Sequence, residues 1–182
     1  MIRLFVALEI PEDTKDALIS LHRLIYEDDI NFSWEAKEKI HLTLKFIGSI
    51  EEEFLPGIIN CLSFLESFNK INGEINKFGF FFRNSIPGIL RVSLNLDMHV
   101  YDIVNQLNSE LAQFGIEPEN RKFKPHLTLL RLKKHPGENF INKFNNYSFK
   151  PMKFESDKIK LIKSELHKSG SEYFEIKTYN LN

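Results

Sequence analysis

The chain carries the same four-residue segment twice. His-Leu-Thr-Leu stands at positions 41–44 and again at 126–129, 85 residues later. Each copy follows the same order of patterns: an apolar, strand-like stretch, a segment with helical apolar spacing, and a loop. The likeness is one of order and spacing, not of wider sequence identity. A chain that repeats one strand–helix–strand pattern is constrained to fold into two similar units.

This repeat predicts an α+β fold. We expect a bilobal arrangement of two pseudo-symmetric antiparallel-sheet lobes, with outer helices around a central cleft to which each lobe contributes one His-Thr strand. No flexible linker or low-complexity segment separates the halves. Residues 1–182 are therefore predicted to form a single domain of two interleaved lobes.

The remaining patterns predict the individual elements. Residues 11–13, Pro-Glu-Asp, suit the first turn of a helix, and Gly115 suits the end of one. Ser49 is a candidate N-cap for a helix whose buried stripe runs from Phe54 to Leu65. The predicted strands span 4–8, 41–46 (ending at Gly48), 74–83, 90–96, 126–129, 158–163 and 173–177; the predicted helices end near 26, 65, 114 and 144; residues 85–88 are predicted to connect a hairpin.

Composition narrows the class of protein. The 24 Lys+Arg nearly balance the 25 Asp+Glu, and the resulting net charge of -1 argues against a protein that coats nucleic acid or membranes. The apolar share of 42% is enough for a packed core. Residues 4–10 are interrupted by Glu9, lack a cleavage-site pattern and are too few to span a membrane. One cysteine fits a reducing compartment, and we predict a soluble, cytoplasmic monomer with no membrane partner.

The repeated histidine and threonine indicate a function. Six histidines and four threonines would produce only about 0.1 His-x-Thr triplets by chance, and the chain has two. Residues i and i+2 of a strand share a face, so His41 is expected beside Thr43 and His126 beside Thr128. A single pair of this kind is usually an ordinary half-buried part of a strand. Core packing, however, does not require the same polar pair twice.

Two histidines that face each other across a cleft are suited to proton transfer. With an unperturbed pKa of about 6.5, one imidazole can act as base and the other as acid near neutral pH. Phosphoester hydrolysis places the attacking and leaving oxygens on opposite sides of phosphorus, which matches groups from opposite lobes. A metal site is the alternative, but catalytic zinc usually needs three protein ligands, and each segment offers one histidine. Cys61 is predicted to be an inert core residue and not a nucleophile.

The motif pair and its flanks resemble a known family. The residues that carry the resemblance are Trp34 and the segments Arg3–Leu8, His41–Gly48 and Phe123–Arg131. They are similar to the 2H phosphoesterases, which are defined by two His-x-Thr motifs, and within them to the RNA 2',3'-cyclic phosphodiesterases once called 2'-5' RNA ligases. The resemblance covers nearly the whole chain and implies one 2H phosphoesterase domain. Many relatives have Trp where Arg91 aligns and Gly where Ser93 aligns, so the base-contacting surface is expected to differ here.

The resemblance implies hydrolysis of the 2',3'-cyclic phosphate ends of RNA to 2'-phosphate, with no metal and no cofactor. It also implies that His41 is the proton donor to the departing 3'-oxygen and that His126 is the proton acceptor that activates water. Thr43 and Thr128 would bind the phosphate. The alternatives are a 2H phosphodiesterase acting on 2'-5' linkages or on another cyclic nucleotide phosphate, and a non-catalytic module that binds RNA ends or nucleotides.

Two further residues are candidates for phosphate binding. Arg131 matches the family motif, although strict alternation from His126 points it away from the cleft unless a bulge turns the strand. Lys45, two residues after Thr43, has the parity to reach an anion.

The surroundings of the motifs suggest RNA contacts. The basic segment, residues 121–134, holds six positive charges and no acidic residue, and the second half of the chain is therefore expected to face RNA; a solvated basic loop is the alternative. Trp34 is a candidate for stacking on a base. For the Phe-rich residues 78–82, core packing is the favoured interpretation.

Overall fold

The computed structural model describes residues 1–26, 32–168 and 170–182. Within these residues the chain forms eight strands and four α-helices, with short 3₁₀ turns at 37–39, 52–54, 62–67 and 112–114. The elements in chain order are β1 (Ile2–Leu8), α1 (Glu12–Ile25), β2 (Leu42–Ile50), α2 (Leu55–Cys61), β3 (Ile71–Arg83), β4 (Ile86–Leu96), α3 (His99–Leu111), β5 (His126–Arg131), α4 (Glu138–Asn145), β6 (Met152–Ser156), β7 (Lys158–His167) and β8 (Gly170–Asn180).

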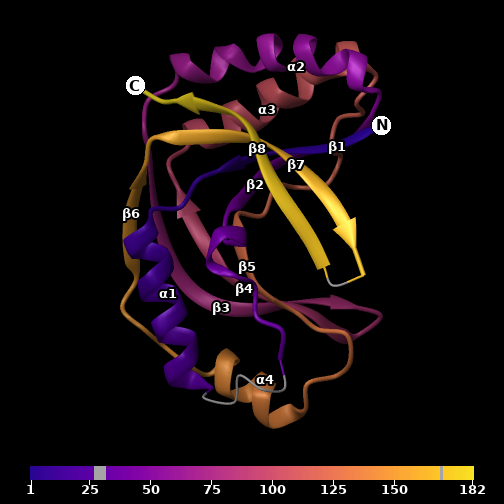
Figure 1. The fold of residues 1–182 in the computed structure, drawn as a ribbon. Helices are drawn as coiled ribbons and strands as arrows, with labels where there is room; N and C mark the ends of the chain where they lie inside the picture. The colour runs from indigo at the N-terminus through magenta and orange to yellow at the C-terminus, as the bar shows by residue number, and fades with distance from the viewer. Residues whose placement is uncertain (27–31, 169) are drawn as a thin grey trace.

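The strands form two four-stranded antiparallel sheets (Figure 1). Sheet A has the order β2-β1-β7-β8, and sheet B has the order β5-β4-β3-β6. In sheet A, α1 connects β1 to its neighbour β2; in sheet B, α3 connects β4 to its neighbour β5. The predicted α+β fold with two pseudo-symmetric, antiparallel lobes is therefore confirmed. The first and last strands of the chain share sheet A, so the lobes do not correspond to the two halves of the sequence.

Each connecting helix packs toward the sheet of the other repeat. Helix α3 contacts β2 of sheet A and lies with α2 at the top of the molecule in Figure 1. Helix α1 reaches sheet B through aromatic contacts: His22 stacks on Trp34, Trp34 contacts Phe144 of α4, and Phe144 packs on Phe78 of β3. Each sheet thus receives part of its cover from the other half of the chain.

One connected apolar core joins the two sheets. Fully buried side chains come from every helix, among them Leu18 of α1, Ile58 of α2, Leu107 of α3 and Phe140 of α4. The sheets add residues that alternate along each strand, listed here for the strands that carry the repeated motif: Leu42 and Leu44 of β2, and Leu127 and Leu129 of β5. Burying one such side chain stabilises the fold by about 1.5–3 kcal/mol. The motif leucines therefore anchor the strands that present the histidines and threonines.

The β3–β4 hairpin turns earlier than predicted. Asn84 and Ser85, with φ of 48° and 62°, make the turn, and β4 begins at Ile86 instead of after Gly88. Two successive positive φ angles are typical of the type I′ turn, whose twist matches that of the flanking strands. Pro87 fits within β4 because it lies at a register shift, where regular pairing is already interrupted.

Several other elements differ from the sequence predictions. Gly48 and Ser49 continue β2, so Ser49 does not cap a helix, and the helical segment begins at Glu52. Strand β6 was not predicted, and β7 and β8 are longer than expected. The α3 helix and its 3₁₀ extension end as predicted at Gly115, which has φ 74°. The loop predicted before Trp34 lies partly outside the described residues.

Candidate active site

The two His-Thr pairs occupy corresponding places in the two sheets. His41 immediately precedes β2 and Thr43 lies in it, while His126 and Thr128 lie in β5. In each strand the histidine and threonine are half-buried and the leucines between them are buried. The predicted division of each strand into a polar face and a core face is therefore present in both lobes.

Both strands contain the same irregularity after the threonine. In sheet A, Ala7 pairs with Thr43 but Val6 pairs with Lys45, so Leu44 is an extra residue. In sheet B, Arg91 pairs with Thr128 but Leu90 pairs with Leu130, so Leu129 is the extra residue. Such bulges shift the alternation of side chains by one position. The exposed residue after each bulge is then Phe46 in β2 and Arg131 in β5.

The bulge in β2 overturns the prediction for Lys45. Its side chain turns to the core side and is only 5% exposed. The ammonium donates hydrogen bonds of 2.7 Å to Asn108 Oδ1 and to the backbone carbonyl of Glu117. Lys45 therefore ties β2 to α3 and the loop that follows this helix, and it is not available to a bound anion.

The bulge in β5 places Arg131 on the side predicted by its family motif. Its Nε donates a 2.9 Å hydrogen bond to Glu35 Oε1. The Glu35 backbone N–H in turn donates to the Leu129 carbonyl at 2.8 Å, and Trp34 forms a bridge to Leu130. The segment before the first motif is thus attached to the strand of the second motif and holds the Arg131 guanidinium.

The ring of His126 is oriented by the backbone. Its Nδ1 lies 2.8 Å from the carbonyl oxygen of Lys124. A carbonyl can only accept a hydrogen bond, so Nδ1 carries the proton and Nε2 holds the free lone pair of the neutral ring. Burial lowers the pKa of His126, the hydrogen bond to Lys124 partly offsets this effect, and the charges of Arg91 and Arg131 lower the pKa further. His126 is therefore suited to accept a proton at Nε2.

His41 lies in a more enclosed aromatic setting. Its ring stacks on Phe5 at a centroid distance of 5.0 Å and meets the edge of Tyr173 at 5.6 Å. Burial lowers its pKa to about 4, and a hydrogen bond with the backbone of Lys39 opposes this change. As with His126, the bonding residue lies two positions before the histidine.

The two histidines are close enough to influence each other electrostatically. The charge of His126 lowers the pKa of His41, and the charge of Arg131 lowers the pKa of both histidines. Strands β2 and β5, which come from different sheets, also contact each other. The structure thus places His41, His126 and Arg131 within electrostatic reach of one another, with Thr43 and Thr128 on the strands β2 and β5 that contact each other.

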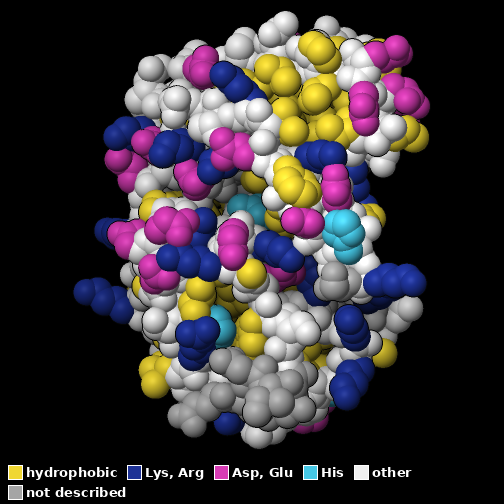
Figure 2. All heavy atoms as spheres, in the orientation of Figure 1, with side chains coloured by type: hydrophobic (Ala, Val, Ile, Leu, Met, Phe, Trp, Pro, Cys, Tyr) yellow, Lys and Arg dark blue, Asp and Glu magenta, His cyan; other side chains and the backbone are white. Residues whose placement is uncertain are grey.

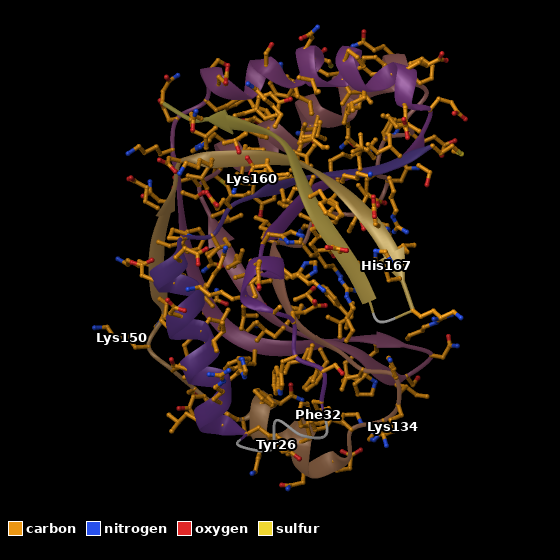
Figure 3. The ribbon with its side chains drawn as sticks, in the orientation of Figure 1. Tyr26, Phe32, Lys134, Lys150, Lys160 and His167 are labelled. Carbon is orange, nitrogen blue, oxygen red and sulfur yellow. The ribbon has the colours of Figure 1, made fainter. Side chains whose placement is uncertain are left out.

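The β7–β8 hairpin completes the surroundings of His41. In Figures 1 and 3 it extends from sheet A toward sheet B, with His167 labelled near its tip. Tyr173 of β8 contacts both His41 and Phe5. Sequence reasoning missed Tyr173 because a strand that pairs far along the chain from the motif gives no local signal. Phe5, in contrast, lies in the strand predicted at residues 4–8, which belongs to the same repeated unit as the first motif.

The aromatic residues considered for base stacking or core packing, Trp34 and residues 78–82, have different environments. Trp34 is partly buried and packs against the core, where one face stacks on His22 at 4.1 Å and the ring also contacts Phe140 and Phe144. Phe78 and Phe80 are buried, which confirms core packing for them. The adjacent Phe81 has another role, because its ring meets the His126 ring at 4.7 Å.

The basic segment, residues 121–134, flanks β5 on both sides. Arg121 forms an ion pair with Glu119 at 2.8 Å, so this charge is partly neutralised. Figure 3 labels Lys134 in the lower part of the molecule, where Figure 2 shows several Lys and Arg side chains. The same view shows acidic side chains across the middle of this face, and the charge of the surface is therefore mixed.

Cys61 at the end of α2 is not activated. Burial raises the pKa of its thiol, and the nearby Glu110 carboxylate raises it further. Since the thiolate is the nucleophile of cysteine enzymes, this residue is poorly suited to such a role, although it is only partly buried and not the core residue that was predicted.

Neither a ligand cluster for a metal nor a membrane helix is found in the described residues. No group of three or more His, Cys, Asp or Glu side chains in residues 1–26, 32–168 and 170–182 could hold a metal ion. Over the same ranges, no helix has the length and apolar character needed to cross a bilayer. A separate open pocket lies at the far part of sheet B, between Asn72, Asp97 and Glu155, and contains neither motif histidine.

Comparison with known proteins supports the assignment of the motifs. The family model described as "LigT like Phosphoesterase" matches the chain twice, over residues 8–89 and 92–173. The chain belongs to this family. Each match contains one of the two His-Leu-Thr-Leu segments, and the prediction of a 2H phosphoesterase is confirmed. The chain is therefore an enzyme of the phosphoesterase class.

Two curated relatives are similar along almost their whole length. A Methanocaldococcus jannaschii protein named RNA 2',3'-cyclic phosphodiesterase is 29% identical, with 97% of this chain and 99% of the relative covered. A Thermotoga maritima protein of the same name is 25% identical, with 94% and 91% covered.

Solved structures share the fold. A crystal structure of a Thermus thermophilus protein has a TM-score of 0.80 and 21% identity, and the match covers 98% of this chain and 97% of that protein. Escherichia coli LigT, crystallised with 3'-AMP, has a TM-score of 0.74 and 21% identity, with 100% and 98% covered. At these identities the structures establish the bilobal architecture.

Proposed function

We propose that this protein hydrolyses the 2',3'-cyclic phosphate ends of RNA to 2'-phosphate without a metal ion, with His41 and His126 as acid and base. The observation that supports this proposal is that two matching His-Thr pairs, one from each sheet, lie on or next to strands that contact each other. The names of the relatives support the choice of substrate.

The proposed reaction needs one proton accepted and one donated. His126 Nε2 takes a proton from water, and the water oxygen forms a bond to phosphorus. The bond between phosphorus and the 3'-oxygen breaks on the opposite side, and His41 gives its proton to that oxygen. The product is a 2'-phosphate with a free 3'-hydroxyl, and the two histidines exchange protonation states during the reaction.

The low pKa of His41 requires that the substrate help to protonate it. In the free protein its pKa of about 4 leaves the ring neutral at pH 7. A phosphate anion about 4 Å away would stabilise the imidazolium by about 4 kcal/mol at an effective dielectric constant of about 20. This is enough to bring the pKa from about 4 to near neutrality. Substrate binding would therefore generate the acid at the site where it is used.

The remaining polar groups would bind the anion. The hydroxyls of Thr43 and Thr128 lie on the same faces as the histidines and can donate hydrogen bonds to the non-bridging phosphate oxygens. Arg131, held by Glu35, supplies a positive charge that acts on both histidines. Charge-assisted hydrogen bonds of this kind are stronger than neutral ones.

A product assay in the presence of chelator tests the proposal. Purified protein is incubated with EDTA and an oligonucleotide ending in a 2',3'-cyclic phosphate, and the product is identified by ³¹P NMR. We expect 2'-phosphate as the product and no loss of rate with EDTA. Loss of activity on chelation would contradict the metal-free mechanism, and a 3'-phosphate product would contradict the order of bond cleavage. Turnover of 2'-5' linkages alone would favour that alternative, and unchanged substrate would favour a non-catalytic binding module.

A further inference from the structure

A row of polar and cationic side chains crosses sheet B beside the second motif. Arg91 of β4 pairs with Thr128, and Ser93 of β4 pairs with His126. On the other side of β4, Ser93 also pairs with Lys77 of β3. Residues directly opposite each other in an antiparallel pair share a face of the sheet. Arg91, Ser93 and Lys77 therefore continue the face that holds His126 and Thr128.

No carboxylate among the described residues holds the Arg91 side chain. Its guanidinium lies 4.5 Å from the centroid of Phe81, and Phe81 is the same ring that meets His126. Its Nη1 donates a hydrogen bond to Ser93 Oγ. The side chain passes over Gly79 of β3, where Nη2 comes within 3.6 Å of the position that a Cβ would take. Aromatic stacking and a neutral hydroxyl thus orient this cation beside the proposed catalytic base.

The charge of Arg91 is not neutralised by the described part of the chain. Its Nε is buried and has no hydrogen-bond partner there, and burial is the cause that lowers the pKa of the guanidinium. A half-buried cation without a counter-ion is costly, because it has lost water and gained no opposite charge. The other arginine of the site differs, since Arg131 pairs with Glu35 at 2.9 Å. The unbalanced positive charge therefore lies at Arg91, one phenyl ring away from His126.

We propose that Arg91 and Ser93, with Lys77 beyond them, bind a second phosphate of the substrate, next to the reacting cyclic phosphate. The ligand is then an oligonucleotide whose backbone runs across sheet B from β5 toward β3, and the enzyme favours RNA ends over cyclic mononucleotides. A planar guanidinium with several donors suits a phosphodiester. This inference rests on the proposed function, because it takes the cyclic phosphate to bind between the two motifs.

The test compares two substrates that share the same cyclic end. The rates kcat/KM are measured for 2',3'-cyclic AMP and for a tri-adenylate ending in 2',3'-cyclic phosphate. We expect wild type to prefer the trinucleotide. Arg91→Met should lower kcat/KM for the trinucleotide on the order of tenfold and for the mononucleotide by about twofold or less. The dependence of log kcat/KM on log salt for the trinucleotide should become shallower by about 0.7, as for one lost phosphate contact.

Three further variants keep the test independent of folding. Arg91→Lys retains the charge and should recover part of the preference. Lys77→Met removes the cation at the end of the row and should weaken the trinucleotide reaction alone. Lys153→Met, which removes an exposed cation of the edge strand β6, is the matched control and should leave both rates and the salt dependence unchanged.

Two results would overturn the subsite. One is an equal loss on both substrates in Arg91→Met, which would make Arg91 part of the machinery for the reacting phosphate. The other is a shifted pH profile with the trinucleotide preference intact, which would restrict Arg91 to tuning His126. If wild type hydrolyses neither substrate, the proposed function fails, and fluorescence anisotropy with a labelled tri-adenylate 2'-phosphate tests the subsite alone. Weaker binding by Arg91→Met would then support it, and equal binding would contradict it.

Discussion

The two halves of the site share the same backbone arrangement and differ in the side chains that surround it. Each has a histidine bonded to the backbone two residues earlier, a threonine on the same face and a bulge after it. On the sheet A side, aromatic rings enclose His41, and the exposed residue after the bulge is Phe46. On the sheet B side, two arginines act on His126. The matching backbone thus positions one imidazole in each lobe. Their different surroundings suit the two imidazoles to different roles.

The largest expected effect is the loss of either histidine. His41→Gln and His126→Gln should each lower kcat by about 10²–10⁴-fold, because each removes one proton transfer. The double variant should be far less impaired than the product of the two losses, since the residues act as a unit. Steady-state rates measure this, and circular dichroism confirms that the fold is kept. Full activity of either single variant would show that the symmetric pair is not the catalytic pair.

Removal of the hydroxyls should have the next largest effect. Thr43→Val and Thr128→Val keep the β-branched shape favoured in strands and remove the donor to the phosphate. A hydrogen bond to a charged group is worth about 1.5–3 kcal/mol, so each variant should lose about 10- to 150-fold in kcat/KM. Thr178→Val in β8, which is separated from β2 by β1 and β7 in sheet A, is the matched control. A loss in only one motif variant would show that a single lobe binds the phosphate.

The low pKa of His41 predicts a pH-dependent stability. The unfolded chain binds a proton at His41 with a pKa of about 6.5, whereas the folded chain does so at about 4. Stability from the neutral ring is therefore complete above pH 6.5 and is lost as the pH falls toward 4. At pH 5 the loss amounts to about 2 kcal/mol.

Urea unfolding of wild type and His41→Gln at pH 7.5 and pH 5.0 measures this difference. The decrease in unfolding free energy on acidification should be smaller in His41→Gln by about 2 kcal/mol. His167→Gln, at the exposed end of the β7–β8 hairpin, should behave as wild type does. An identical decrease in His41→Gln would mean that this ring is not destabilised by protonation.

Substitutions of the exposed residues that follow the two bulges, Arg131 and Phe46, should change kcat/KM by modest and unequal factors. Arg131→Met removes a charge that is mostly solvent-exposed and shared with Glu35, so we expect a loss of about tenfold in kcat/KM. Phe46→Met, at the corresponding position of β2, should change kcat/KM by about twofold or less, because no charge is lost. Equal effects at both positions would contradict the electrostatic distinction between the half-sites.

These contrasts also explain what the sequence could predict. The His-Thr faces follow from the two-residue period of a strand, so His41, Thr43, His126 and Thr128 could be placed without a structure. The bulges at Leu44 and Leu129 could not be predicted from the sequence, because a leucine in a bulge has the same apolar character as any other buried strand residue. The prediction that Lys45 faces a bound anion was therefore wrong. The bulge at Leu129 likewise determines which face of the sheet Arg131 lies on.

Contacts between segments that are distant in the sequence also could not be predicted from local sequence patterns. Tyr173 reaches His41 only because the hairpin of the last two strands joins the sheet of the first two. The role of Arg91 depends on Phe81 and Ser93, which come from two neighbouring strands. Such contacts arise from strand order and register, which hydrophobic periodicity does not specify.

The most direct test of a single two-histidine site is an NMR titration of both rings with the product. Labelled His41 and His126 are assigned with the two glutamine variants, and their pKa values are measured with and without one equivalent of 2'-AMP. We predict a pKa of about 4 for His41 in the free protein, a lowered pKa for His126, and a rise in both when a single molecule binds. A rise at only one histidine, or saturation at two equivalents, would contradict a single phosphate site between the sheets.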